Sequence, residues 1–148
     1  MKLYFAADHG GFELKQQLIE YFQEKYEVID LGADHFQEDD DYPDLAAKLA
    51  RILINETDEA RGILLCRSGG GMAIVANKIA GIRAVDIFDE KSARHARADN
   101  KANVISLGAD WLNLDQAIKA IETFLQTRFS QEPRHIRRIK KIAQLEKK

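Results

Sequence analysis

Short apolar runs alternate along this chain with segments whose apolar residues recur at helical spacing, and this alternation constrains the fold most. The runs cover residues 3–7, 26–31, 62–66, 82–88 and 103–107. The helical patterns cover residues 12–24, a segment that starts at 42–43, and residues 72–80, 90–99 and 114–129. Strands that alternate with helices form parallel sheets covered on both faces. We therefore predict an α/β fold of three layers, with a five-stranded parallel sheet in the middle.

Composition narrows the class of protein. The 148 residues fit one domain, 1–148, and 45% of them are hydrophobic, as in ordinary globular proteins. A net charge of −2 implies no general attraction to nucleic acid or to an anionic membrane. No apolar stretch approaches the length of a membrane span, and Asp8 and His9 come too early for a secretory signal. One cysteine excludes an internal disulfide. We expect a cytoplasmic, enzyme-sized domain.

The most informative motif follows the third apolar run. That run ends in Cys66, the only cysteine, and Arg67, Ser68 and three glycines, 69–71, come next. A thiol beside backbone N–H groups and a helix start is a candidate nucleophile or base, whereas the simpler alternative is a buried structural cysteine. A cysteine-phosphatase loop would need Arg where Met72 stands, and neither a Walker A loop nor a dinucleotide fingerprint is present. What remains is a base beside an anion hole, suited to proton abstraction next to a carbonyl.

A second polar pair follows the first predicted strand. Asp8 and His9 stand there, before two glycines. Ligands of open α/β sheets bind at the carboxyl ends of the strands. If the strand order begins 2-1-3, Asp8 and His9 share one pocket with Cys66 and Ser68; the alternative is a capping Asp and a surface His.

The tail, residues 131–148, is charged and repeats Ile136, Ile139, Ile142 and Leu145 at helical spacing. Such a stripe fits a solvated terminal helix or a helix that packs on a partner subunit. Arg134 and Arg138 are four residues apart, so on a helix they share one face. Two guanidinium groups on one face suit a phosphate, although a solvated basic tail is the alternative.

Several blocks match one family in order and at family spacing. They are residues 7–15, 41–43, 62–66 with Ser68, Gly69 and Gly71, 76–78, 81–84, Asn100 with 103–104, and Arg134-His135 with Arg138. The chain resembles the ribose-5-phosphate isomerase B and galactose-6-phosphate isomerase group over nearly its whole length. The resemblance implies a Rossmann-like fold, a homodimer whose two active sites mix residues of both subunits, and aldose–ketose isomerisation without metal or cofactor. Pairing of dimers into a dimer of dimers stays open.

The resemblance also implies a role for each matching residue. Cys66 would be the base that moves a proton between C1 and C2 through an enediolate. The oxyanion would be held by Ser68 and by the backbone from Arg67 through Gly69, Gly70 and Gly71. The remaining substrate-binding positions would be Asp8 and His9 near hydroxyls and ring oxygen, Tyr42 on the pocket wall, Asn100 at the sugar, and Arg134 and Arg138 at the phosphate.

Three positions depart from the family pattern. Asp99 replaces the usual His that acts in ring opening, so this catalytic position carries a base at neutral pH, and His95 one turn earlier is a possible substitute. Asp110 replaces an Arg that reaches the phosphate, and Arg67 replaces a small residue, which can return positive charge to the pocket. Two alternatives therefore stay open: an isomerase for another phosphorylated or free sugar, and a non-catalytic sugar- or phosphate-binding module.

Overall fold

The computed structural model describes residues 1–147 and contains one parallel sheet. Its strands are β1 (Lys2–Ala7), β2 (Glu27–Asp30), β3 (Arg61–Cys66), β4 (Ala84–Ile87) and β5 (Val104–Gly108). All four pairings are parallel, and the spatial order is β2-β1-β3-β5-β4. The predicted α/β class, the five strands and the 2-1-3 start of the order are thus confirmed.

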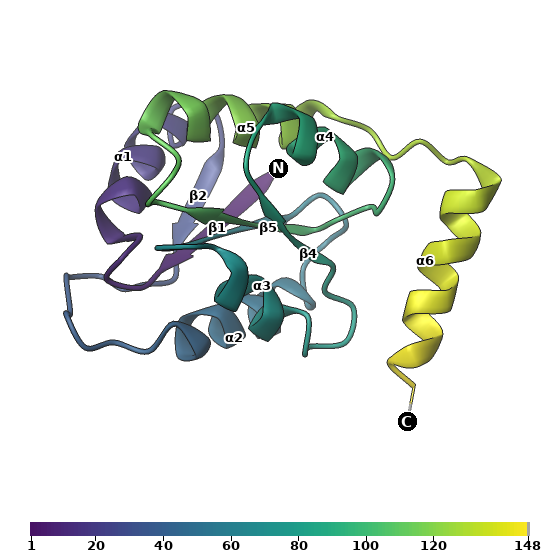
Figure 1. The fold of residues 1–148 in the computed structure, drawn as a ribbon, viewed down its shortest axis with the longest axis horizontal. Coiled ribbons are helices and arrows are strands. Elements are labelled where there is room, and N and C mark those ends of the chain that lie inside the picture. The colour runs from purple at the N-terminus through teal and green to yellow at the C-terminus, as the bar shows by residue number, and fades with distance from the viewer. Residues whose placement is uncertain (148) are drawn as a thin grey trace.

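Helices follow the strands as the pattern predicts (Figure 1). They are α1 (Phe12–Phe22), α2 (Tyr42–Leu53), α3 (Gly70–Ala76), α4 (Glu90–Ala98), α5 (Leu114–Gln126) and α6 (Pro133–Leu145). The largest difference is α3, which begins two residues before and ends four residues before the predicted 72–80. It ends where the Asn77 side chain accepts from the Ala84 N–H and donates to the Ala84 carbonyl, both at 2.8 Å. These two bonds tie the end of α3 to the start of β4.

The sheet separates two apolar cores. One contains Leu3, Phe5, Phe22 and Phe124 and lies between the sheet and α1, α4 and α5. The other contains Tyr4, Ala6, Leu49 and Met72 and lies between the sheet and α2 and α3. Alternate residues of β1 point to opposite faces, so consecutive residues of this one strand contribute to both cores. An almost uninterrupted apolar strand is typical of a parallel sheet buried on both faces.

Helix α6 stands away from this body (Figure 1). Pro133 at its start suits the first helical turn, where no backbone N–H is needed. Most of its apolar stripe is uncovered: Ile136 and Ile142 are exposed, Leu145 is 85% exposed, and Ile139 is half-buried. Only His135 is buried in this helix. Among residues 1–147, no helix combines the length and apolar character of a membrane span.

Candidate active site

The loops after β1 and β3 meet at the carboxyl edge of the sheet. The Asp8 N–H donates to the Leu65 carbonyl at 3.3 Å. Gly10 lies directly under the Arg67 side chain, because a Cβ at Gly10 would be 2.5 Å from Arg67 Cγ. The neighbourhood predicted from the 2-1-3 order therefore exists, and the Asp8-His9 pair lies beside the Cys66–Ser68 segment.

Cys66 is the last residue of β3, and its side chain is 5% exposed. Its Sγ accepts the backbone N–H of Gly69 at 3.0 Å. Gly69 has φ +82°, a conformation that residues with a side chain rarely adopt. The Ser106 hydroxyl on β5 donates to the Gly69 carbonyl at 2.6 Å, so the N–H is held in place. An N–H aimed at sulfur stabilises negative charge there, as a base requires.

The rest of the glycine loop forms the mouth of this site. Arg67 and Ser68 are exposed, so their side chains are accessible to a ligand. Tyr42 begins α2, and its ring lies against Gly71, where a Cβ would be 2.7 Å from the Tyr42 Cζ atom. The predicted position of Tyr42 on the wall beside the loop agrees with this contact.

Asp8 is held by the backbone that follows it. Its Oδ1 accepts from the N–H groups of Gly10 at 2.9 Å and Gly11 at 3.3 Å. The residue is buried, and burial raises the pKa of the Asp8 carboxyl; the charge of His9 and the two N–H groups oppose this rise. Asp8 is thus a fixed hydrogen-bond acceptor at the end of β1.

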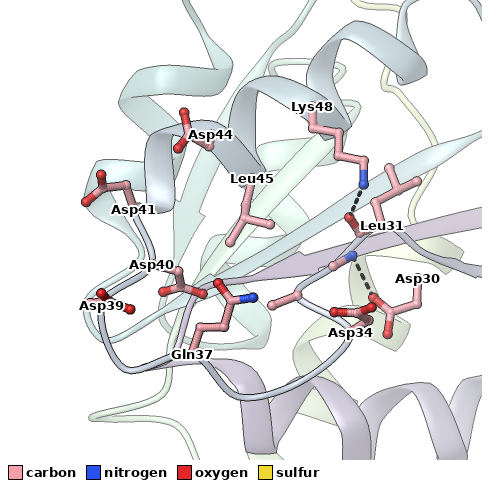
Figure 2. A pocket seen from close by; sticks show the side chains of 12 residues that line it. Asp30, Leu31, Asp34, Gln37, Asp39, Asp40, Asp41, Asp44, Leu45 and Lys48 are labelled. Atoms are coloured by element: carbon pink, nitrogen blue, oxygen red, sulfur yellow. Dashed lines mark hydrogen bonds between the residues drawn. The ribbon is translucent and has the colours of Figure 1, made fainter.

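His9 has a partner that the sequence patterns did not predict. One oxygen of Asp40, Oδ1, accepts from the His9 backbone N–H at 2.9 Å and lies 2.8 Å from His9 Nδ1. The hydrogen bond to Asp40 raises the pKa of His9 above its usual value. Asp40 belongs to an acidic loop that precedes α2 (Figure 2). The run of three aspartates at 39–41, beside the matching block 41–43, was the only sequence signal for it.

Asp8, His9 and Asp40 are also the one group among the described residues that offers three potential metal-ligand atoms within 4.8 Å of one another. Both carboxylates already accept hydrogen bonds, from Gly10, Gly11 and His9. Protein donors therefore explain why these acids stand here. The absence of a required metal stays a prediction.

The other predicted site residues lie elsewhere in the same chain. Helix α4 starts after the carboxyl end of β4 and runs back, so Asp99 and Asn100, which follow it, lie at the amino edge of the sheet. The start of α6 is anchored beside them, since the Ser130 N–H donates to the Ala98 carbonyl at 3.0 Å. Arg134 and Arg138 are exposed on α6. A single chain thus divides the predicted residues between opposite edges of its sheet.

The Asp99 carboxylate contacts the imidazole ring of His95. Its Oδ2 lies 2.8 Å from Nδ1 of His95, one helical turn earlier, and its Oδ1 lies 3.9 Å from Nδ1 of buried His135. His95 is exposed, with its other ring nitrogen free to meet solvent or a ligand. Asp99 therefore forms a hydrogen-bonded pair with His95.

Two further acids lie near the glycine loop. The Asp110 N–H donates to the Arg67 carbonyl at 3.0 Å, which places this departure from the family pattern next to the site. Oδ1 of Asp86 on β4 lies where a Cβ on Gly69 would stand, and this buried oxygen has no hydrogen-bond partner among residues 1–147. Burial raises the pKa of Asp86 to about 6. The sequence signal for this contact was Asp86 itself, a charged residue inside the predicted strand 82–88.

Fold and site together define an α/β protein with a candidate ligand site at the carboxyl ends of parallel strands, around one thiol and a backbone N–H. The family described as Ribose/Galactose Isomerase matches residues 3–142. The chain belongs to this family.

Its relatives are ribose-5-phosphate isomerases of type B. The chain is similar to the probable ribose-5-phosphate isomerase B of Mycoplasma genitalium, with 38% identity over 146 residues, 98% of this chain and 95% of the relative. The ribose-5-P isomerase B of Listeria innocua is 42% identical over 131 residues, 88% and 87% of the two chains. The crystal structure of the Mycoplasma genitalium enzyme with bound ribulose-5-phosphate has a TM-score of 0.94 and 36% identity, and 99% and 97% of the two chains are covered.

Proposed function

We propose that this protein interconverts ribose 5-phosphate and ribulose 5-phosphate by proton transfer at carbon. The observation that carries the proposal is the Cys66 thiol, which accepts a hydrogen bond from the Gly69 N–H and belongs to the segment that adjoins the loop of Asp8 and His9. The relatives support the same substrate, because one of them is described with ribulose-5-phosphate bound.

The chemistry follows from this geometry. Cys66, as the thiolate, removes the proton from C2 of the open-chain aldose. The electrons of that C–H bond form the C1–C2 double bond of an enediolate, and the carbonyl electrons move to O1. The same thiol returns the proton to C1 while the hydroxyl proton on O2 is transferred to O1, which gives the ketose. Donors that point at the developing oxyanion typically contribute about 2.7–4 kcal/mol each.

A second copy of the chain completes the site. Asp99 and Asn100 lie at the edge opposite Cys66, and Arg134 and Arg138 lie on α6, which stands away from the sheet (Figure 1). One chain therefore does not bring these residues to its own thiol. The carboxyl edge carries an exposed apolar rim of Ile74, Phe88 and Trp111, in which the rings of the last two lie 6.2 Å apart. Helix α6 carries the exposed stripe described above. Two such uncovered surfaces support a homodimer in which α6 and the amino edge of one subunit meet the carboxyl edge of the other.

In this arrangement the second subunit supplies the phosphate and ring-opening groups. Arg134 and Arg138 bind the phosphate, and Asn100 binds the sugar. The His95–Asp99 pair donates the proton that opens the ring, since an imidazole offers an N–H donor whereas an ionised carboxylate can only accept.

The location follows from the same thiol. A catalytic cysteine must stay reduced, and a reducing compartment favours this state. This requirement supports the predicted cytoplasmic location.

The deciding experiment is an isomerisation assay with a panel of aldose phosphates and the matching free sugars. We expect turnover of ribose 5-phosphate, with slower or no turnover of free ribose, because the phosphate contacts are lost. Preference for another phosphorylated sugar would change the substrate but keep the reaction class. Binding of sugar phosphates without turnover of any of them would indicate the non-catalytic alternative and overturn the proposal.

A further inference from the structure

Asp40 differs from the other acids of its loop. Residues 31–41 connect β2 to α2, and Asp34, Asp39 and Asp41 are exposed there. The Asp40 side chain is only 10% exposed. Figure 2 shows Asp41 pointing away from the loop while the Asp40 carboxylate turns toward its inside. The loop lines an open pocket of about 750 Å³ that Asp40 shares with these acids.

The contacts of Asp40 with His9 fix the ring. A single oxygen, Asp40 Oδ1, accepts the His9 backbone N–H and contacts Nδ1 at 2.8 Å. An ionised carboxylate can only accept, so the hydrogen is on Nδ1. The backbone bond also fixes where the loop lies relative to the end of β1. His9 therefore keeps Nε2 as the ring atom free to contact a ligand.

The charges around His9 come from three elements. Asp8 follows β1, Asp40 comes from the loop before α2, and Arg67 comes from the loop after β3. The two carboxylates favour the imidazolium, whereas Arg67 opposes it. Asp40 contributes most through its hydrogen bond, which raises the pKa of His9. An imidazolium at this position presents an N–H donor toward the substrate.

The second oxygen of Asp40 lowers the stability of the folded protein. Oδ2 is buried and has no hydrogen-bond partner among residues 1–147. A buried acceptor without a partner lowers stability, and such exceptions are concentrated at functional sites. A carboxylate stands here although its second oxygen lacks a partner among residues 1–147. Its contribution to the site is the two contacts that its first oxygen makes with His9.

We infer that Asp40 is a positioning residue, which holds the His9 ring with Nδ1–H toward itself and, in the imidazolium form, presents Nε2–H as a donor to the substrate. The inference rests on the proposed function for the identity of the substrate, but the pairing of Asp40 with His9 does not. No contact between Asp40 and the reacting carbons is needed, because its effect passes through His9.

The test compares Asp40→Asn with Asp39→Asn, an exposed neighbour in the same loop. The chain has four histidines, so the His9 signals can be assigned in NMR spectra with a His9→Gln sample. In the wild-type protein we expect Nδ1 to be protonated at every pH at which the fold persists. We expect the His9 titration midpoint to fall in Asp40→Asn and to stay unchanged in Asp39→Asn.

Kinetics give the second readout. At pH 7.5 Asp40→Asn should raise KM for ribose 5-phosphate by about tenfold, the loss of one charge-assisted contact, with a smaller effect on kcat. At pH 5.5, which lies below the ordinary pKa of histidine at about 6.5, we expect His9 to be protonated even without Asp40, and KM should return toward the wild-type value. A purely structural role would lower activity equally at both pH values.

Each possible failure has its own meaning. A wild-type His9 with unprotonated Nδ1, or an unchanged titration and KM in Asp40→Asn, would overturn the role of Asp40. Activity that disappears with a chelator and returns with a divalent ion would also overturn it, because Asp40 would then act with Asp8 and His9 as a ligand. If Asp40→Asn does not fold, the protonation of His9 Nδ1 in the wild-type protein still decides whether Asp40 has the inferred role. The NMR result without isomerase activity would refute only the proposed function.

Discussion

Asp86 should limit the stability of this protein above pH 6. Its pKa is raised to about 6 from the usual 3.8 because burial disfavours the charged form. Well below pH 4 the folded and unfolded states are both protonated, and the carboxyl has no effect through charge. As the pH rises from about 4 to 6, the unfolded state is ionised while the folded state still holds its proton, so stability is lost over this range and the full loss persists above it.

The size of this loss follows from the shift. About two pKa units correspond to roughly 3 kcal/mol as an upper limit. Asp86 is only half-buried, and solvent screening reduces the effect to about 1–2 kcal/mol. Asp86→Asn keeps the shape and removes the charge. We therefore expect this variant to exceed the wild type by about 1–2 kcal/mol at pH 8, or about 3–6 °C in Tm for a chain of this size, and to match it near pH 4.

Urea unfolding at pH 4, 6 and 8 measures this difference, with Asp39→Asn as an exposed control of the same charge change. The free energy of unfolding of this control should differ little from that of the wild type at all three pH values. A gain in Asp86→Asn that is the same at pH 4 and pH 8, or a variant less stable than the wild type at pH 8, would refute the reasoning.

Three further predictions concern the composite site. Light scattering should show a homodimer at micromolar concentration, and Leu145→Arg on the exposed stripe should weaken it; an active monomer would contradict the shared site. Asp110→Arg should lower KM for ribose 5-phosphate by roughly tenfold and leave free ribose unaffected, whereas equal KM values would show that Arg67 already supplies the charge. His95→Gln should reduce turnover of ribose 5-phosphate by about a hundredfold but spare a tetrose phosphate that cannot close a ring; equal losses on both substrates would exclude a role in ring opening.

The sequence predicted the fold well because β-strands and helices here have clear and different apolar periods. It predicted the Cys66 region from the 2-1-3 order, since parallel strands bring their carboxyl ends to one edge. The predicted end of α3 was wrong, because the helix ends at contacts between Asn77 and Ala84, a residue seven positions away.

Tertiary contacts explain the features that sequence reasoning missed. Asp40 and His9 are 31 positions apart, and nothing in a periodic pattern pairs them. The approach of Asp86 to Gly69 depends on where β4 and β5 enter the sheet, an order that the sequence left open. The placement of Asp99 and Asn100 at the opposite edge could have been deduced, because a helix that follows a parallel strand runs back along the sheet.

The role of Cys66 is tested most directly by Cys66→Ala assayed in D2O. Ribose 5-phosphate turnover and deuterium incorporation at the transferred carbon are measured together, and circular dichroism verifies the fold. We expect kcat to fall by at least about a hundredfold, the usual scale for loss of a general base, and incorporation to be lost with it. Turnover and incorporation near wild-type values in the folded variant would contradict Cys66 as the base.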